Sequence, residues 1–358
     1  MTPDFPFIGY DPDGLMGRPI VEGWLAAMRL DDSIRKTVLY VGRAKKGPFQ
    51  AEGTGFITVT FEGPHAFQQL VTAKHVIDGI PGDMVDLRLN RLDGTAQVIE
   101  TPKEHWIPHP DPNVDLAICP SMIPKDQFDI QFVDVDDTSV WDLSKNPNAI
   151  GIGDEVYIPG MFIARMGEAK NIPILRTGTI AAMPEEKIKT QYGYHDAYLI
   201  EARSIDGLSG SPVWAFTALM QINKDKKIVP TPVLAFAPLG VLLGHHQVLN
   251  PRETIEIQQT KGRRRKSPKE AGIPLNTGIG VVLPLAAVRE AIHQEHLIKA
   301  RREAVERKEN QTRRFVSDSV SKGAAVVTSA DAKSDNPAHK EDFRSLLTEA
   351  AKTRTQGD

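Results

Sequence analysis

The chain has 358 residues, of which 41% are hydrophobic and 25% charged, and its formal net charge is −3. This length suits two or three folded units, and the composition is that of an ordinary soluble globular protein. A net charge so close to zero gives no overall attraction to nucleic acid or to an anionic membrane. Neither is therefore expected among its partners.

The single cysteine, Cys119, excludes an internal disulfide and cannot form a thiolate metal site alone, so we expect it in the core. The N-terminus, MTPDFPFIGYDPDG, lacks the basic start and the apolar run of a secretory signal. No run of about 18 apolar residues predicts a spanning helix. These features together favour a cytoplasmic, soluble protein.

Residues 1–34 form an N-terminal extension, rich in Pro and Gly at first and then with a short helical pattern. Short segments rich in Val, Ile, Thr and Phe follow, bounded by Gly, Pro, Asn and Asp, which is typical of antiparallel strands. The first set comprises residues 37–44, 53–61, 67–77, 84–90 and 95–100. After a loop-rich stretch over 119–151, the second set comprises residues 154–162, 174–183, 196–204, 211–216, 232–246 and 277–284. Two β halves joined by a long connection predict two packed barrels or sandwiches.

The pattern changes from Leu285 onward. Apolar residues recur at near-helical spacing among charges over 285–308, which predicts one long helix. From about residue 310 the chain is rich in Ser, Ala and charge, which predicts disorder. Within it, 340–352 has the pattern of a short amphipathic helix, either a docking segment or an incidental match.

Three segments carry residue types that work together in nucleophilic catalysis: His75 in VTAKHVI, Asp115 in NVDLAIC and Ser209 in GLSGSP. An imidazole has a pKa suited to accepting the serine proton, and a carboxylate on its far nitrogen fixes the tautomer. Gly207 lets backbone N–H groups turn toward an oxyanion without a Cβ in the way. Taken alone, GLSGSP is also compatible with an ordinary turn.

In this order, the three segments resemble the histidine, aspartate and serine boxes of trypsin/chymotrypsin-fold serine peptidases, especially the short bacterial trypsin-like ones. Downstream, GVLLGHH (240–246) resembles the strand that lines the primary specificity pocket of that family. TGIGVVLPLAAVREAI (277–292) resembles its last strand and C-terminal helix. The resemblance spans about residues 35–298.

The resemblance implies an all-β fold of two packed six-stranded antiparallel barrels, over about 35–145 and 146–284, followed by a C-terminal helix. Residues 299–358 are then a helical and finally disordered charged tail. No metal or organic cofactor is implied. The partner implied is a protein or peptide substrate, held as an extended strand. The tail lies outside the resemblance, and a regulatory protein bound through it is a further candidate partner.

The resemblance also implies a serine endopeptidase with His75, Asp115 and Ser209 as its catalytic residues. The N–H groups of Gly207 and Ser209 then form the oxyanion hole, and Ser211 is structural. Family members that are activated by cleavage carry an aspartate where this chain has Leu208, so activation by an inserted N-terminus is not expected.

Two further residues are candidates for substrate binding. Arg203 lies six residues before the nucleophile, where the family often places the floor of the primary specificity pocket, and His245 flanks the same pocket. A guanidinium there favours an acidic residue before the scissile bond. Arg203 pairing outward with Glu201 or Asp206 remains the alternative.

The competing interpretation is a non-catalytic binding or scaffold module on the same fold, since fold does not imply function. The basic run 261–269 is either a solvated loop or an anion site, and nucleic-acid binding through it is a third interpretation. His293 and His296 lack an evident third ligand, so no metal site is expected from them.

Overall fold

The computed structural model describes residues 32–44, 47–136, 150–190, 193–202, 207–222, 228–248 and 275–321. Several sequence predictions concern residues outside these ranges: the start of the N-terminal extension, Arg203, the basic run 261–269, and the tail beyond residue 321 with its 340–352 segment.

The first unit is a curled, mostly antiparallel sheet of eight strands, entered through the short helix η1 (Asp32–Thr37). Its strands are β1 (Val38–Arg43), β2 (Gln50–Glu62), β3 (His65–Thr72), β4 (Met84–Asn90), β5 (Ala96–Pro102), β6 (Ile107–Pro108), β7 (Ala117–Ser121) and β8 (Val133–Asp134). They run in the order β5-β4-β1-β2-β3-β7-β6, with β8 paired to β2. Two short helices, α2 (Lys74–Gly79) and η2 (Lys103–His105), connect them.

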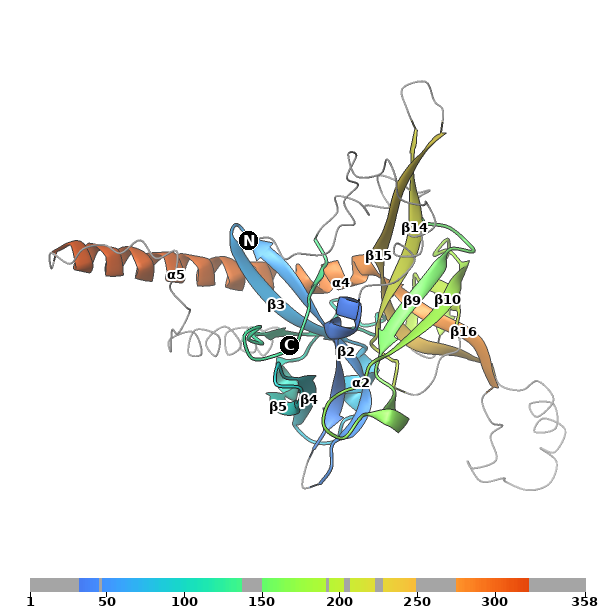
Figure 1. Cartoon of the computed structure of the whole chain (residues 1–358), viewed down its shortest axis with the longest axis horizontal. Coiled ribbons are helices and arrows are strands. Elements are labelled where there is room, and N and C mark those ends of the chain that lie inside the picture. Colours follow the sequence, from blue (N-terminus) through green and yellow to red (C-terminus); the bar gives the residue numbers. More distant parts are fainter. Residues whose placement is uncertain are drawn as a thin grey trace, which may run out of the picture.

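The second unit is a closed barrel of six strands in the order β10-β13-β16-β15-β14-β9 (Figure 1). These are β9 (Glu155–Gly160), β10 (Ile174–Ala182), β13 (Tyr198–Glu201), β14 (Pro212–Ile222), β15 (Ile228–Val248) and β16 (Leu275–Pro284). The helix η3 (Ile163–Arg165) follows β9, and the hairpin of β11 (Ile188–Thr190) and β12 (Gly193–His195) lies between β10 and β13.

The expected mostly-β, trypsin-like architecture with a C-terminal helix is confirmed, with one difference. Within the described residues the hydrogen-bonded path of the first unit does not close, so this unit is a curled sheet rather than a complete barrel. The division into domains at residues 34, 145, 284 and 298 stays a prediction.

Both units bury continuous apolar surface, and one hydrophobic cluster crosses from the first to the second. Ile118 and Ala117 of the first sheet belong to the same cluster as Leu243 and Leu283 of the barrel and Val288 of the C-terminal helix. A second cluster fills the barrel interior. Separating the two units would expose the apolar side chains of this cluster to water, so the cluster stabilises their packing against each other.

The strand predicted over 67–77 is interrupted. β3 ends at Thr72, which pairs with Ala117, the first residue of β7. Beyond this pair no β7 residue remains to continue the ladder, and the chain turns into α2. The helix places His75 at the end of β3, beside the segment that carries Asp115.

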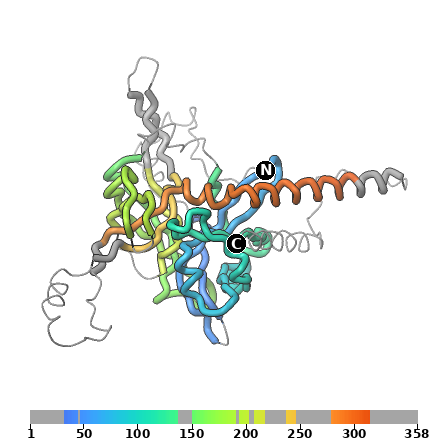
Figure 2. Tube along the Cα trace, turned by 180° about the vertical axis from the view of Figure 1, so that it is seen from behind, coloured from blue at the N-terminus to red at the C-terminus, as the bar shows by residue number. Residues whose placement is uncertain are grey.

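The single long helix predicted from residue 285 is in fact two helices. α4 (Leu285–Ile292) and α5 (Glu295–Ser321) are separated at His293 and Gln294. The Arg301 guanidinium of α5 donates to the Ile292 carbonyl at 2.9 Å, an acceptor that a continuous helix would use in its own ladder. α4 lies against the strands, whereas α5 extends away from both units (Figures 1 and 2).

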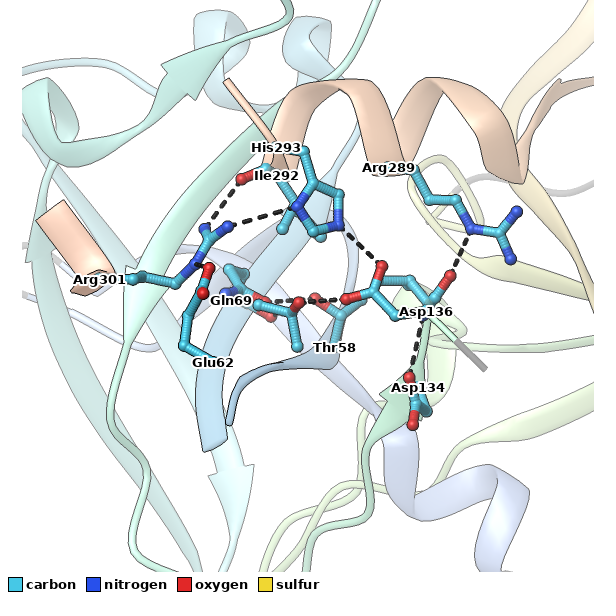
Figure 3. A network of polar contacts seen from close by, with 11 residues as sticks. Thr58, Glu62, Gln69, Asp134, Asp136, Arg289, Ile292, His293 and Arg301 are labelled. Carbon is cyan, nitrogen blue, oxygen red and sulfur yellow. Dashed lines mark hydrogen bonds and ion pairs between the residues drawn. The ribbon is translucent and has the colours of Figure 1, made fainter. Parts of the chain in front are cut away.

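A network of polar contacts fastens these helices to the first sheet (Figure 3). His293 Nε2 lies 2.7 Å from Asp136 Oδ1, and Arg301 Nε lies 3.4 Å from Glu62 Oε1 on β2. Burial lowers the pKa of the Arg301 guanidinium, and the Glu62 carboxylate partly offsets this. In the described ranges no helix combines the length and apolarity needed to cross a membrane.

Arg301→Met should lower the free energy of unfolding by about 2–4 kcal/mol, because it leaves the Glu62 carboxylate and the Ile292 carbonyl without their buried donor. The matched control is Arg302→Met. Arg302 lies 3.8 Å from Glu62 Oε2, but its side chain is 69% exposed, so less than about 0.5 kcal/mol is expected. Urea unfolding of both variants measures the difference, and equal effects would show that Arg301 does not anchor the helix.

Candidate active site

His75 and Asp115 form a hydrogen-bonded pair although 40 residues separate them. His75 Nδ1 lies 2.5 Å from Asp115 Oδ2, and the His75 backbone N–H donates to Asp115 Oδ1 at 2.8 Å. The Asp115 side chain is 8% exposed and that of His75 is 36% exposed. Both carboxylate oxygens are therefore committed to one residue, which orients the ring and leaves its Nε2 as the remaining ring nitrogen.

The turn over residues 207–210, here called the 207–210 turn, lies against the same corner of the first sheet. The Thr54 N–H donates to the Ser209 carbonyl at 2.9 Å. A Cβ on Gly53 would come within 2.9 Å of both the Ser209 carbonyl and the Val76 side chain, next to His75. A Cβ on Gly210 would lie 3.1 Å from the backbone nitrogen of Ala73. The fold thus brings the three boxes together from both units.

The conformation of the 207–210 turn requires its glycines. Gly207 has φ +98° and Gly210 has φ +86°, in the region that side chains rarely adopt. A Cβ on Gly207 would also lie 2.6 Å from both the Met161 carbonyl and Ile163 Cγ1. Within the described part of the chain, neither the Gly207 nor the Ser209 N–H donates a hydrogen bond. Their assignment to an oxyanion hole stays a prediction.

Leu208 and Ser211 both point into the protein. Leu208 is fully buried in the barrel core, and a Cβ on Gly160 would contact both of these side chains. Ser211 is also fully buried, and its hydroxyl has no hydrogen-bond partner among the described residues. Ser209, in contrast, is half-buried. The more accessible of the two hydroxyls is therefore that of Ser209.

Of the two candidate substrate-binding residues, Arg203 and His245, the structure describes only His245. Arg203 lies outside the described residues. His245 lies on β15 opposite Gly280 of β16, three residues beyond Leu242, whose carbonyl accepts the Gly210 N–H at 2.7 Å. Its ring Nδ1 is buried without a hydrogen-bond partner in the described part of the chain. A substrate-binding role for either residue stays a prediction.

The remaining candidates are structural. Asp111, the other aspartate of the segment that carries Asp115, is half-buried, and hydrogen bonds from Asn113 lower the pKa of its carboxyl group. Cys119 is buried as expected, and burial raises the pKa of its thiol to about 12. His293 belongs to the helix network, and burial lowers the pKa of His296. No group of three metal-ligating side chains occurs within the described ranges.

One residue near the site escapes sequence reasoning. Thr54, within the apolar stretch GTGFITVTF, is fully buried and contacts the 207–210 turn through both its backbone N–H and its hydroxyl. In the sequence nothing distinguishes Thr54 from Thr58 and Thr60, the other threonines of this stretch. Only the packing of the two units reveals its neighbours.

No family model matches the chain, and no curated protein matches it. Among solved structures, it is similar to the MamO protease domain from Magnetospirillum magneticum (12% identity, 74% of this chain and 100% of that chain, TM-score 0.43). It is also similar to the inactive form of Rv3671c from M. tuberculosis H37Rv (17% identity, 80% and 96%, TM-score 0.37). A third similarity is to HBP (12% identity, 74% and 93%, TM-score 0.38).

These similarities concern the fold alone and are too distant to carry an argument about activity. The strand order, the closed barrel and the convergence of the three boxes define the architecture. The fold is trypsin-like.

Proposed function

We propose that this chain is a serine endopeptidase that cleaves peptide bonds through Ser209, His75 and Asp115. The observation that carries the proposal is the His75–Asp115 pair, in which both carboxylate oxygens bind one histidine beside the 207–210 turn. Such an arrangement suits a histidine that must gain and lose a proton in a fixed orientation. The competing interpretation is a non-catalytic binding module on the same fold, and the experiment below distinguishes the two.

In the proposed mechanism the Ser209 Oγ attacks the carbonyl carbon of the scissile peptide while His75 Nε2 takes its proton. Asp115 holds the Nδ1–H tautomer and stabilises the imidazolium that forms. The N–H groups of Gly207 and Ser209 donate to the oxyanion. His75 then protonates the leaving amine, and a water molecule, deprotonated by His75, hydrolyses the acyl-enzyme and regenerates Ser209.

The proposed substrate is a protein or peptide bound as an extended strand. His245 and Arg203 are proposed to line the pocket for the residue before the scissile bond, which favours an acidic side chain there. A regulatory partner of the C-terminal tail and a cytoplasmic location belong to the same proposal.

A fluorophosphonate probe tests the proposal without knowledge of the substrate. We expect the full chain, with an N-terminal tag in place, to form a covalent adduct that maps by mass spectrometry to Ser209. The tag matters because Leu208 offers no carboxylate to a liberated N-terminus, so no cleavage should be needed. Absence of the adduct under native conditions would favour the binding module, and an adduct formed only after trimming would contradict activity in the uncleaved chain.

A further inference from the structure

Thr54, on β2 of the first sheet, contacts the 207–210 turn through its hydroxyl and its backbone N–H. Its hydroxyl donates to the Gly207 carbonyl at 2.6 Å and accepts the Met161 N–H at 2.9 Å. Its backbone N–H donates to the Ser209 carbonyl at 2.9 Å. A hydroxyl has one proton to give, so donation to Gly207 and acceptance from Met161 together fix its orientation.

The segment that Thr54 binds at Met161 also packs on the turn. The Met161 carbonyl and the Ile163 side chain occupy the space that a Cβ on Gly207 would need. The Tyr40 hydroxyl of β1 donates to the Phe162 carbonyl at 2.9 Å. Burial raises the pKa of Tyr40 to about 12, which keeps it a neutral donor at physiological pH. The first sheet thus holds residues 161–163 against Gly207.

Further along, Arg88 of β4 binds the same segment. Its guanidinium donates to the carbonyls of Gly167 and Glu168 at 3.1 and 3.0 Å and to Asn171 Oδ1 at 2.8 Å. The Asn171 side chain returns a hydrogen bond to the Arg88 carbonyl at 2.6 Å. Residues 161–171 are therefore fastened to the first sheet at both ends.

The 207–210 turn contains no charged side chain, so no ion pair holds it in place. Leu208 is apolar and fully buried, so the described anchors of the 207–210 turn are neutral hydrogen bonds and packing. Fixing the Gly207 carbonyl fixes the peptide plane that joins Gly207 to Leu208, and fixing the Ser209 carbonyl fixes the plane that joins Ser209 to Gly210. The Ser209 N–H belongs to the plane between these two, and the Gly207 N–H belongs to the plane that precedes the first.

We propose that Thr54 is a positioning residue that sets the 207–210 turn so that the N–H groups of Gly207 and Ser209 face the reacting carbonyl. The inference rests on the proposed peptidase function. Donors of this kind act because they are aimed before the reaction begins, and small misplacements are costly. The Thr54 hydroxyl, which belongs to the first sheet, orients the turn of the barrel through this hydrogen bond.

The test compares Thr54→Val, which keeps the shape and removes the hydroxyl, with Thr54→Ser, which keeps the hydroxyl. The matched control is Thr58→Val. Thr58 is equally buried on the same strand, and its hydroxyl donates to the Gln69 carbonyl at 3.2 Å, away from the turn. We expect Thr54→Val to lower kcat by about 10- to 100-fold, with KM little changed. Thr54→Ser should restore most of the rate, and Thr58→Val should leave kcat near the parent value.

Amide hydrogen exchange of the peptide that contains residues 207–210 gives a second readout, independent of activity. Exchange should be faster in Thr54→Val than in the parent and unchanged in Thr58→Val. Equal kcat and equal exchange in the two valine variants would overturn the inference. If the parent neither reacts with the probe nor hydrolyses peptides, the proposed function fails, and exchange alone then decides whether Thr54 orders the turn.

Discussion

Ser209→Ala is expected to lower kcat for peptide hydrolysis by about 10⁶-fold, the loss typical when a triad serine is removed. The change deletes one oxygen from a half-buried position and leaves the backbone contacts of the 207–210 turn in place. The variant should therefore melt within a few degrees of the parent. A chromogenic peptide assay and a thermal melt on the same preparation measure both quantities.

Ser211→Ala is the matched control, two residues along the same loop. Its hydroxyl is fully buried and has no hydrogen-bond partner within the described ranges, so its removal should leave kcat nearly unchanged. If Ser211→Ala abolished hydrolysis while Ser209→Ala retained it, the nucleophile would be misassigned.

Asp115→Asn is expected to lower kcat by about 10⁴-fold with the fold intact. Asparagine retains one carbonyl oxygen for the His75 backbone N–H, but its amide group then faces His75 Nδ1. An N–H donor there favours the tautomer that carries its proton on Nε2, and such a ring is unable to accept the Ser209 proton. Steady-state kinetics should show the loss mainly in kcat.

Asp111→Asn provides the comparison, because it changes the other carboxylate of the same loop. Asp111 is half-buried and accepts hydrogen bonds from Asn113 rather than from His75. Its substitution should change kcat by less than about two-fold, because its carboxylate binds a residue of its own loop and lies outside the proposed triad. A large loss in Asp111→Asn together with a small loss in Asp115→Asn would reverse the assignment of the histidine's partner.

Strand patterning and residue chemistry, together with the family resemblance, were enough to predict the catalytic candidates and the general architecture. Alternating Val, Ile and Thr bounded by turn residues predicts strands whatever their partners, because the pleat itself imposes the period of two. Asp115 directly precedes the apolar run LAIC, which is typical of a buried carboxylate, and the whole residue is 7% exposed. Gly207 was predicted from the conformational freedom that its turn needs, and its φ is +98°.

Tertiary contacts decided where particular strands and helices end. β3 ends at Thr72, where the β7 ladder also ends, so His75 lies on a helix rather than on the predicted strand. The C-terminal helix divides at His293 and Gln294, and Arg301 donates to the Ile292 carbonyl from across the break. The first unit is a curled sheet because its end strands are not paired within the described residues.

By itself, the sequence determined which residue types were present in a workable order: a histidine, a buried carboxylate, and a serine in a glycine turn. Tertiary structure alone decided which groups hold that turn. Thr54 and Met161 lie 107 residues apart in the chain, yet they meet at one hydroxyl. Hydrogen bonds have a range of about 3 Å, so such a contact is specified only after the two units have packed and leaves no periodic trace in the sequence.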